Sequence, residues 1–221
     1  VVKPADINVY SLRSTLEDLK RMGELVETDV PVDPDLEFAG IQKRMDGGPT
    51  TLFNRVKGYE HARFAMNLFA NRKRIDRMFG FNGPTDRTRK IAESLHSPLK
   101  PVVVDRKEAP AQEVVITAPF HVNDHIVPIR HTELEEEATI GSGISMLVGN
   151  YFGGGTHVGY NRMNFRWGNV GTFQVAPGSH VWMSMTKHYK KGPIPVTVNF
   201  GVPPAVTLAA GAGFDYIILP Y

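Results

Sequence analysis

The strongest chemical signal in the chain lies between Thr156 and Arg166, where His157, Asn161 and Arg162 follow one another closely. In a strand, successive side chains point to opposite faces, so His157 and Asn161 would share one face and Arg162 the other. A neutral imidazole is a common metal ligand, and the guanidinium fork of arginine matches the geometry of phosphate and carboxylate. These residue types indicate a site that combines a metal, a phosphate and an anchored carboxylate.

His180 is the second candidate metal ligand, and it follows the turn sequence Pro177-Gly178-Ser179. Backbone N–H groups of such a turn can face an anion, although Pro-Gly-Ser is also an ordinary turn. His157 and His180 can share a metal only if neighbouring strands or turns bring them together; otherwise they are two hydrogen-bonded histidines. Two imidazoles do not complete a metal site, so Mg²⁺ or Mn²⁺ would need additional oxygen ligands.

The remaining charged residues carry weaker signals. Arg162 either clamps an anion or forms a surface ion pair that contributes little, and Arg166 is expected to be structural. Residues 133–137 are expected to form a solvated acidic face, and residues 209–213 lack the spacing of a dinucleotide loop. The chain has no Gly-x-Ser-x-Gly, Walker or HExxH motif. A second loose group, interpreted as loop chemistry, consists of His121, Asp124, His125 and His131.

Composition narrows the class of protein. The 221 residues are 42% hydrophobic, which suffices for one large core or two modest domains. The 25 basic and 23 acidic residues leave a formal charge of only +2, which argues against nucleic-acid binding. Absence of cysteine excludes disulfides and thiolate metal sites and fits a reducing compartment. No apolar run approaches the ~18 residues of a membrane span, and residues 1–5 show no signal-peptide pattern. We therefore expect a cytoplasmic protein without membrane contact.

The first part of the chain is predicted to alternate helices and strands. Ser11 would cap a helix that ends at Gly23, and Asp33-Pro34 would cap and begin a second helix through about Arg44. The alternation stops near residues 98–101, which we interpret as a domain boundary. Further strands are expected at residues 24–30, 51–53 and 63–69, and further helices at residues 72–79 and 86–95.

The second part is dominated by short strands between Gly, Pro and Asn residues. A helix is expected at residues 181–190, and another begins at Pro204 or Ala205. The apolar end, residues 216–221, predicts either a docked interface or, as we favour, a longer polypeptide. Strands are expected at residues 102–104, 113–117, 144–148, 158–166, 172–175 and 195–201.

Five segments, in this order, resemble the UbiD family of reversible decarboxylases, which use prenylated FMN. The resemblance runs from about Ser11 to Leu208, and the order of the segments is more specific than any single one. The segments are SLRSTLEDLKRMGELVETDVPVDPDLEFAGI, TLFNRVKGYEHARFAMNLFANRKRIDRMFG, HVGYNRMNF, PGSHVWM and PIPVTVNFGVPPAVTLAA.

The resemblance implies an α+β protein. Residues 1–100 would form an N-terminal α/β domain, and residues 101–221 would form part of a flavin-binding split β-barrel, incomplete at its C-terminal end. The cofactor would be prenylated FMN, whose phosphate is held through Mn²⁺ or Mg²⁺ with a K⁺ nearby. Proteins of this family are usually homodimers or larger homo-oligomers.

The resemblance also implies roles for single residues. Arg162 falls on the catalytic arginine and His180 on a metal-binding histidine, whereas His157 occupies a position usually held by an asparagine ligand. The glutamate ligand and the two acidic residues that complete the catalytic network would follow Tyr221, and no glutamate of this chain is assigned to those roles. The implied cofactor-binding residues are Gly159, Tyr160, Asn161, Arg162, Ser179, His180, Ala210 and Gly211.

The implied reaction is the reversible, non-oxidative decarboxylation of an aromatic, heteroaromatic or α,β-unsaturated carboxylic acid, with the acid and CO₂ as partners. Arg162 would orient the carboxylate of that acid. Three alternatives stay open on the residues alone. They are a non-catalytic or redox FMN-binding protein on the same barrel, a metal-dependent hydrolase that uses His157 and His180, and a partner-dependent subunit.

Overall fold

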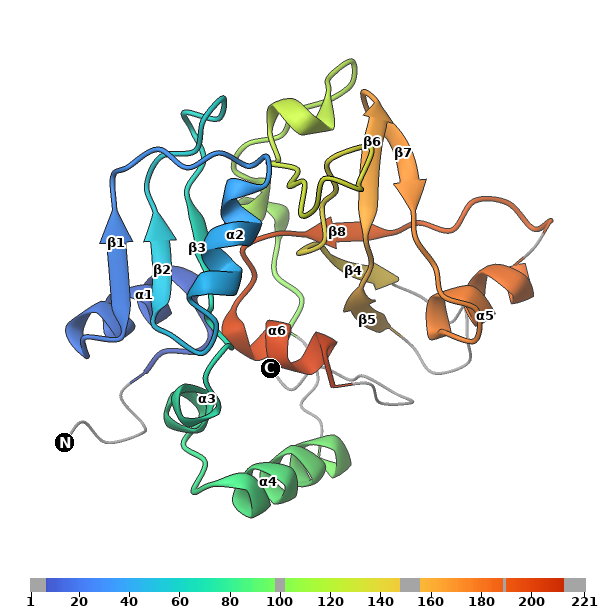
Figure 1. Cartoon of the computed structure of the whole chain (residues 1–221). Coiled ribbons are helices and arrows are strands. Elements are labelled where there is room, and N and C mark those ends of the chain that lie inside the picture. The colour runs from blue at the N-terminus through green and yellow to red at the C-terminus, as the bar shows by residue number, and fades with distance from the viewer. Residues whose placement is uncertain (1–6, 98–101, 148–155, 189, 213–221) are drawn as a thin grey trace.

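A computed structural model describes residues 7–97, 102–147, 156–188 and 190–212, which form a mixed α/β fold with small, open sheets (Figure 1). The first sheet has the order β1-β2-β3, with β1 parallel to β2 and β2 antiparallel to β3. Its strands are β1 (Leu25–Thr28), β2 (Thr50–Phe53) and β3 (Phe64–Met66). The helices of this part are α1 (Leu12–Arg21), α2 (Glu37–Arg44), α3 (Arg72–Phe79) and α4 (Pro84–His96).

Helix α1 follows the prediction from its cap residues. The Ser11 side chain accepts a hydrogen bond from the Ser14 N–H at 3.3 Å, which satisfies one of the free donors at the helix start. Gly23 follows the helix with a φ of +71°, a conformation that favours glycine. Leu16 and Leu19 are buried on the inner face, so local signals and packing agree here.

The predicted start of α2 at Asp33-Pro34 is wrong, because the helix begins at Glu37. The Asp33 carboxylate accepts the Asp35 N–H at 2.9 Å and so forms a turn in front of the helix. Glu37 reaches back to accept the Asp33 N–H at 2.6 Å. Leu36, the residue that precedes the helix, has a φ of +67°. The side chains expected to cap the helix therefore stabilise a turn in front of it.

The core of the first part lies between α2 and its sheet. Phe38 of α2 packs against Phe53 of β2 and Phe64 of β3, with ring centroids 5.0 and 4.2 Å apart. Val32 and Val56 are buried in the same cluster. Every residue of β2 is buried, which is consistent with its place between β1 and β3.

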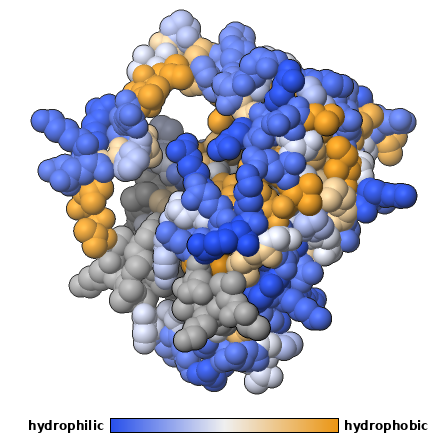
Figure 2. Space-filling model, turned by 90° about the vertical axis from the view of Figure 1, so that its left-hand side faces the viewer, coloured by the Kyte–Doolittle hydropathy of each residue, from blue (hydrophilic) through white to orange (hydrophobic). Residues whose placement is uncertain are grey.

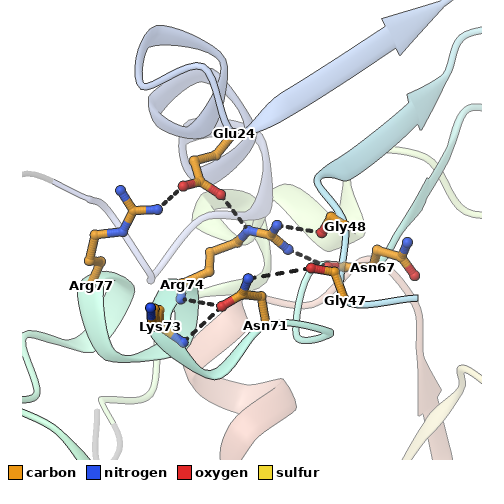
Figure 3. A network of polar contacts seen from close by, with 8 residues as sticks. All are labelled: Glu24, Gly47, Gly48, Asn67, Asn71, Lys73, Arg74 and Arg77. Carbon is orange, nitrogen blue, oxygen red and sulfur yellow. Dashed lines mark hydrogen bonds and ion pairs between the residues drawn. The ribbon is translucent and has the colours of Figure 1, made fainter. Parts of the chain in front are cut away.

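A buried arginine joins the parts of this region (Figure 3). Arg74 of α3 is only 2% exposed and donates to the backbone oxygens of Asn67 at 2.7 Å and Gly48 at 2.6 Å. Its Nε lies 3.1 Å from a carboxylate oxygen of Glu24, to which Arg77 also pairs. Since each polar group of Arg74 has a partner, the charge is tolerated in the interior.

The second part holds a three-stranded sheet in the order β5-β4-β8, with both pairings antiparallel. A separate two-stranded hairpin pairs β6 with β7. Helix α6 packs beneath β4 and β5, where Ile144, Val158 and Ala210 form a buried cluster. The elements are β4 (Ile144–Leu147), β5 (His157–Tyr160), β6 (Met163–Trp167), β7 (Val170–Phe173), α5 (His180–His188), β8 (Thr197–Asn199) and α6 (Pro204–Ala210).

The single strand predicted for residues 158–166 is wrong in one respect: it divides into β5 and β6, which belong to different sheets. The division falls at Asn161 and Arg162. Met163 pairs with Ile140 through two backbone hydrogen bonds of 2.8 and 2.9 Å, which draws β6 away from the β4–β5 ladder.

The strands predicted at residues 102–104 and 113–117 do not form. Short 3₁₀ helices at Arg106–Glu108 and Pro110–Gln112 lie between these segments. Val103 is 93% exposed and Val114 is 76% exposed. Valine favours strands because its side chain packs well against the neighbouring strands of a pleated sheet. No described strand pairs with these segments, so the preference has no effect here. The predictions at residues 98–101, 148 and 216–221 lie outside the described residues.

The surface is mostly polar on the face shown in Figure 2, where hydrophobic residues gather in limited patches. In the part of the chain that the structure describes, no helix is both long and apolar enough to cross a bilayer.

Candidate functional site

His157 and His180 come together, as the sequence analysis required of a shared metal site. Their ring centroids are 5.2 Å apart and the rings are nearly perpendicular, at 85°. His157 lies at the start of β5, and His180 is the first residue of α5. Burial lowers the pKa of His157, and the neighbouring His180 lowers it further. The neutral imidazole that this favours is the form that binds metals.

Two local features position the rings. Gly159 leaves room for the His157 ring, because a Cβ at this position would lie 3.1 Å from Nε2 of His157. Ser179 caps α5: its hydroxyl accepts the Trp182 N–H at 3.2 Å. The Pro-Gly-Ser sequence is therefore the N-terminal turn of a helix, and it directs the His180 ring toward β5.

The donors present fit the nitrogen part of a divalent-metal site. Manganese and similar ions accept imidazole but complete their coordination with oxygen ligands. Among the described residues, no group of three His, Cys, Asp or Glu side chains is placed to hold a metal. His157 and His180 could thus supply two ligands of a site whose oxygen ligands come from elsewhere.

The side chains of Tyr160 and Asn161 hold the strand in place. The Asn161 Oδ1 accepts from the Ser145 hydroxyl at 2.5 Å, and its Nδ2 donates to the Gln174 backbone oxygen at 3.0 Å. The Tyr160 hydroxyl donates to the Thr207 backbone oxygen at 3.1 Å. These bonds tie the end of β5 to β4, to the segment that follows β7 and to α6.

Ala210 and Gly211, at the end of α6, lie against the same strand. Ala210 is buried with Val158, and a Cβ on Gly211 would lie 3.8 Å from the Tyr160 ring. Small residues at this position keep the end of α6 close to β5.

Arg162 forms an ion pair with Glu135, whose Oε1 lies 3.4 Å from Nη1 of Arg162. The arginine side chain is 52% exposed, whereas that of Glu135 is 20% exposed. Arg166 pairs with Glu137, which also accepts from the Asn164 amide at 2.7 Å. The structural role expected of Arg166 stays a prediction. The acidic segment was expected to be solvated, but Glu135 pairs with Arg162, and Glu137 pairs with Arg166 and Asn164 of β6.

The second histidine group does not assemble into a site. His121 lies near Gly168, His125 packs edge-on against Phe120 at 6.0 Å, and His131 contacts Glu135. No metal-binding group of three arises from these residues in the described ranges.

Sequence reasoning missed Ser145 and Glu135. Ser145 is fully buried and binds both Asn161 and the backbone oxygen of Gly159, at 3.1 Å. Its position in a short apolar strand gave no signal. Glu135 could have been noticed from its spacing to His131, four residues earlier.

The described residues thus define a mixed α/β protein in which the two candidate metal-binding histidines meet at the starts of β5 and α5, while Arg162 lies between β5 and β6. Comparison with known protein families finds two family models that together match most of the chain. The model of the 3-octaprenyl-4-hydroxybenzoate carboxy-lyase N-terminal domain matches residues 16–95. The model of the 3-octaprenyl-4-hydroxybenzoate carboxy-lyase Rift-related domain matches residues 102–218. The chain belongs to the UbiD family.

Individual relatives agree with this assignment. Gallate decarboxylase from Lactiplantibacillus plantarum is 28% identical over 233 residues, covering 96% of this chain and 46% of the relative. An evolved dimeric form of the UbiD-class enzyme HmfF from Pelotomaculum thermopropionicum, solved with prFMN, gives a TM-score of 0.84 at 25% identity. That match covers 94% of this chain and 48% of HmfF.

The apo 3,4-dihydroxybenzoic acid decarboxylase from Enterobacter cloacae gives a TM-score of 0.83 at 28% identity, with 96% and 46% of the two chains covered. The chain therefore spans about half the length of the relatives it matches.

Proposed function

We propose that the chain supplies the cofactor- and metal-binding part of a reversible, non-oxidative decarboxylase that uses prenylated FMN. The observation that carries this proposal is the meeting of the His157 and His180 rings on β5 and α5. The HmfF relative was solved with prFMN, and two other relatives are decarboxylases of gallate and 3,4-dihydroxybenzoate. We infer that the substrate is an aromatic carboxylic acid, within the wider class of heteroaromatic and α,β-unsaturated acids.

The domain organisation belongs to the same proposal. Residues 1–100 would form the N-terminal α/β domain, and residues 101–221 would form part of the flavin-binding split β-barrel. The boundary between the two family models, after residue 95 and before residue 102, supports this division. A homo-oligomer is proposed because a dimeric form of HmfF is among the relatives. A cytoplasmic location is part of the proposal.

His157 and His180 would hold the divalent metal, Mn²⁺ or Mg²⁺, beside the phosphate of the cofactor, with a K⁺ nearby. Two imidazoles favour Mn²⁺, because Mg²⁺ prefers an all-oxygen shell. The remaining cofactor contacts would come from Gly159, Tyr160, Asn161, Ser179, Ala210 and Gly211. Prenylated FMN, when bound, would supply the electron sink for the loss of CO₂.

Arg162 would bind and orient the carboxylate of the acid. The guanidinium offers parallel N–H donors that match two carboxylate oxygens. Its half-exposed side chain is accessible to a ligand, and its one acidic neighbour in the described residues is Glu135. When the carboxylate is held in one orientation, much of the entropy that the reaction would otherwise lose is already lost on binding, so the activation barrier is lower.

The test replaces Arg162 in the full-length enzyme that contains this chain, produced together with prenylated FMN, with 3,4-dihydroxybenzoate and gallate as substrates. Arg162→Ala should abolish CO₂ release and leave the circular dichroism spectrum unchanged, because the role of Arg162 is to place charge. Arg166→Ala is the matched control, since it removes a guanidinium that lies four residues further along the chain and already pairs with Glu137. Near-normal turnover by Arg162→Ala would contradict the assignment.

A further inference from the structure

Glu135 is placed between two partners of different kinds. Its Oε2 accepts the backbone N–H of His131 at 2.7 Å and lies 3.3 Å from Nδ1 of the same residue. Its Oε1 faces Nη1 of Arg162 at 3.4 Å. One oxygen is thus anchored to the local chain, while the other meets the guanidinium.

The segment that carries Glu135 is closed at its base. Ile129 and Thr139 exchange two backbone hydrogen bonds, of 2.8 and 2.9 Å. The next residue, Ile140, exchanges two more with Met163, which directly follows Arg162. These backbone bonds hold the segment that carries Glu135 beside the segment that carries Arg162. The two side chains are therefore already close before they form the ion pair.

The electrostatic setting favours an ionised Glu135. The backbone N–H of His131 is the main cause that lowers the pKa of Glu135, and the charges of His131 and Arg162 add to it. In the described part of the chain, Glu135 is the single acidic side chain within ion-pair distance of Arg162. A guanidinium has five N–H donors, so contact at Nη1 leaves donors for a second carboxylate.

We propose that Glu135 is the positioning residue for Arg162: it holds the guanidinium at Nη1, so that the remaining N–H groups receive the substrate carboxylate in one orientation. This inference rests on the proposed decarboxylase function. Glu135 does not touch the substrate. It acts through Arg162, and its effect is on how well the acid is bound.

The chain supplies a matched control. Glu137 lies two residues after Glu135 on the same segment. It pairs with Arg166, which lies four residues after Arg162. Both glutamates neutralise a guanidinium on or beside β6. Only Glu135 faces the arginine that would bind substrate, so Glu135→Gln and Glu137→Gln remove equal charge with different expected results.

The first measurement does not depend on turnover. Benzoate is titrated into the protein while the guanidinium ¹⁵N–H signals are followed by NMR, with Arg162→Ala used to assign the Arg162 signal. Glu135→Gln should weaken benzoate binding about fivefold, near the upper range for a half-exposed ion pair. Glu137→Gln should leave the affinity within about twofold, since surface substitutions elsewhere have small effects.

The second measurement uses the full-length enzyme that contains this chain, loaded with prenylated FMN, with 3,4-dihydroxybenzoate as substrate. Glu135→Gln should raise KM about fivefold with kcat nearly unchanged, the pattern of lost ground-state binding. Glu135→Ala is a second variant, and urea unfolding checks that each protein is folded.

The outcomes distinguish a failure of the positioning role of Glu135 from a failure of the proposed decarboxylase function. Equal benzoate affinity in Glu135→Gln and Glu137→Gln overturns the positioning role. If Arg162→Ala loses turnover in that case, the decarboxylase proposal stands without this refinement. Near-normal turnover by Arg162→Ala instead removes the proposed function on which the inference rests.

Discussion

The His157 and His180 rings meet edge to face with their centroids 5.2 Å apart, although one ring lies on a strand and the other begins a helix. Each is fixed by a different local device. Pairing of Leu147 with His157 sets the strand, and the Ser179 hydroxyl sets the helix start. The proximity of the two imidazoles is a property of the tertiary fold, and the first two predictions test it.

Replacing His180 should affect metal and cofactor together. His180→Ala removes one of two nitrogen donors, and we expect the affinity for Mn²⁺ to fall at least about tenfold, with flavin content falling in parallel. Elemental analysis and the flavin absorbance of the purified protein measure both. His96→Ala is the control, because His96 lies at the end of α4, away from β5. Unchanged metal content in His180→Ala would contradict the metal role.

Replacing His157 by asparagine should be tolerated. The family resemblance implies an asparagine ligand at this position, and the amide oxygen of asparagine suits Mn²⁺ and Mg²⁺. We expect His157→Asn to retain metal and cofactor, measured as for His180→Ala. Loss of the cofactor from this variant would show that the imidazole itself is required.

Removing the buried guanidinium of Arg74 should destabilise the first part of the chain. Arg74→Ala leaves the backbone oxygens of Asn67 and Gly48 without this donor and removes one partner of Glu24. We expect a loss of about 3 kcal/mol in the free energy of unfolding. Urea denaturation provides the measurement. Arg77→Ala, which removes a 44%-exposed partner of the same carboxylate, should cost less than about 1 kcal/mol; similar losses for both variants would refute the argument.

Asp86 should make the free energy of unfolding fall as the pH is lowered below 3.8. The Asn82 N–H is the main cause that lowers the pKa of Asp86 from 3.8 to about 2, and Arg89 and Lys90 add to it. A lowered pKa means that the ionised carboxylate stabilises the folded state above pH 3.8. This contribution is lost as the pH falls toward about 2.

Asp86→Asn tests that dependence by urea unfolding at a series of pH values. The variant should be less stable than the unmodified protein at pH 5, and the difference should shrink and vanish near pH 2. Glu93→Gln is the control, because Glu93 has a partner in Arg89 but no backbone N–H donor. A difference between Asp86→Asn and the unmodified protein that does not vary with pH would contradict this role for the carboxylate.

The parts of the fold that the sequence predicted well are those with local causes. Ser11 and Gly23 bracket α1 because capping and positive φ depend on the residue itself. The valines at residues 102–104 and 114–115 have the same intrinsic preference as those in true strands. Whether they pair depends on distant chain segments, and a single sequence does not reveal those.

The same division applies to the site. The chemical types of His157, His180 and Arg162 were visible in the sequence, whereas the meeting of the two imidazoles depends on the pairing of β4 with β5 and on the start of α5. The break at Asn161 had a signal that the prediction did not use. Apolar residues fall on even positions up to Tyr160 and on odd positions from Met163, so the alternation changes phase at Asn161 and Arg162. The pairing of Glu135 with Arg162 depends on the backbone contact between Ile140 and Met163, which has no sequence signature.

The central place of β4 has a consequence for how the protein is made. Ile144 pairs with Tyr160 on one side and with Asn199 on the other. Synthesis proceeds from the N-terminus, so β4 and β5 can pair early, whereas β8 leaves the ribosome much later. Until then one edge of β4 is unpaired, and exposed edges of this kind attract other strands. The strand that bears His157 can thus pair before the sheet that supports it is complete.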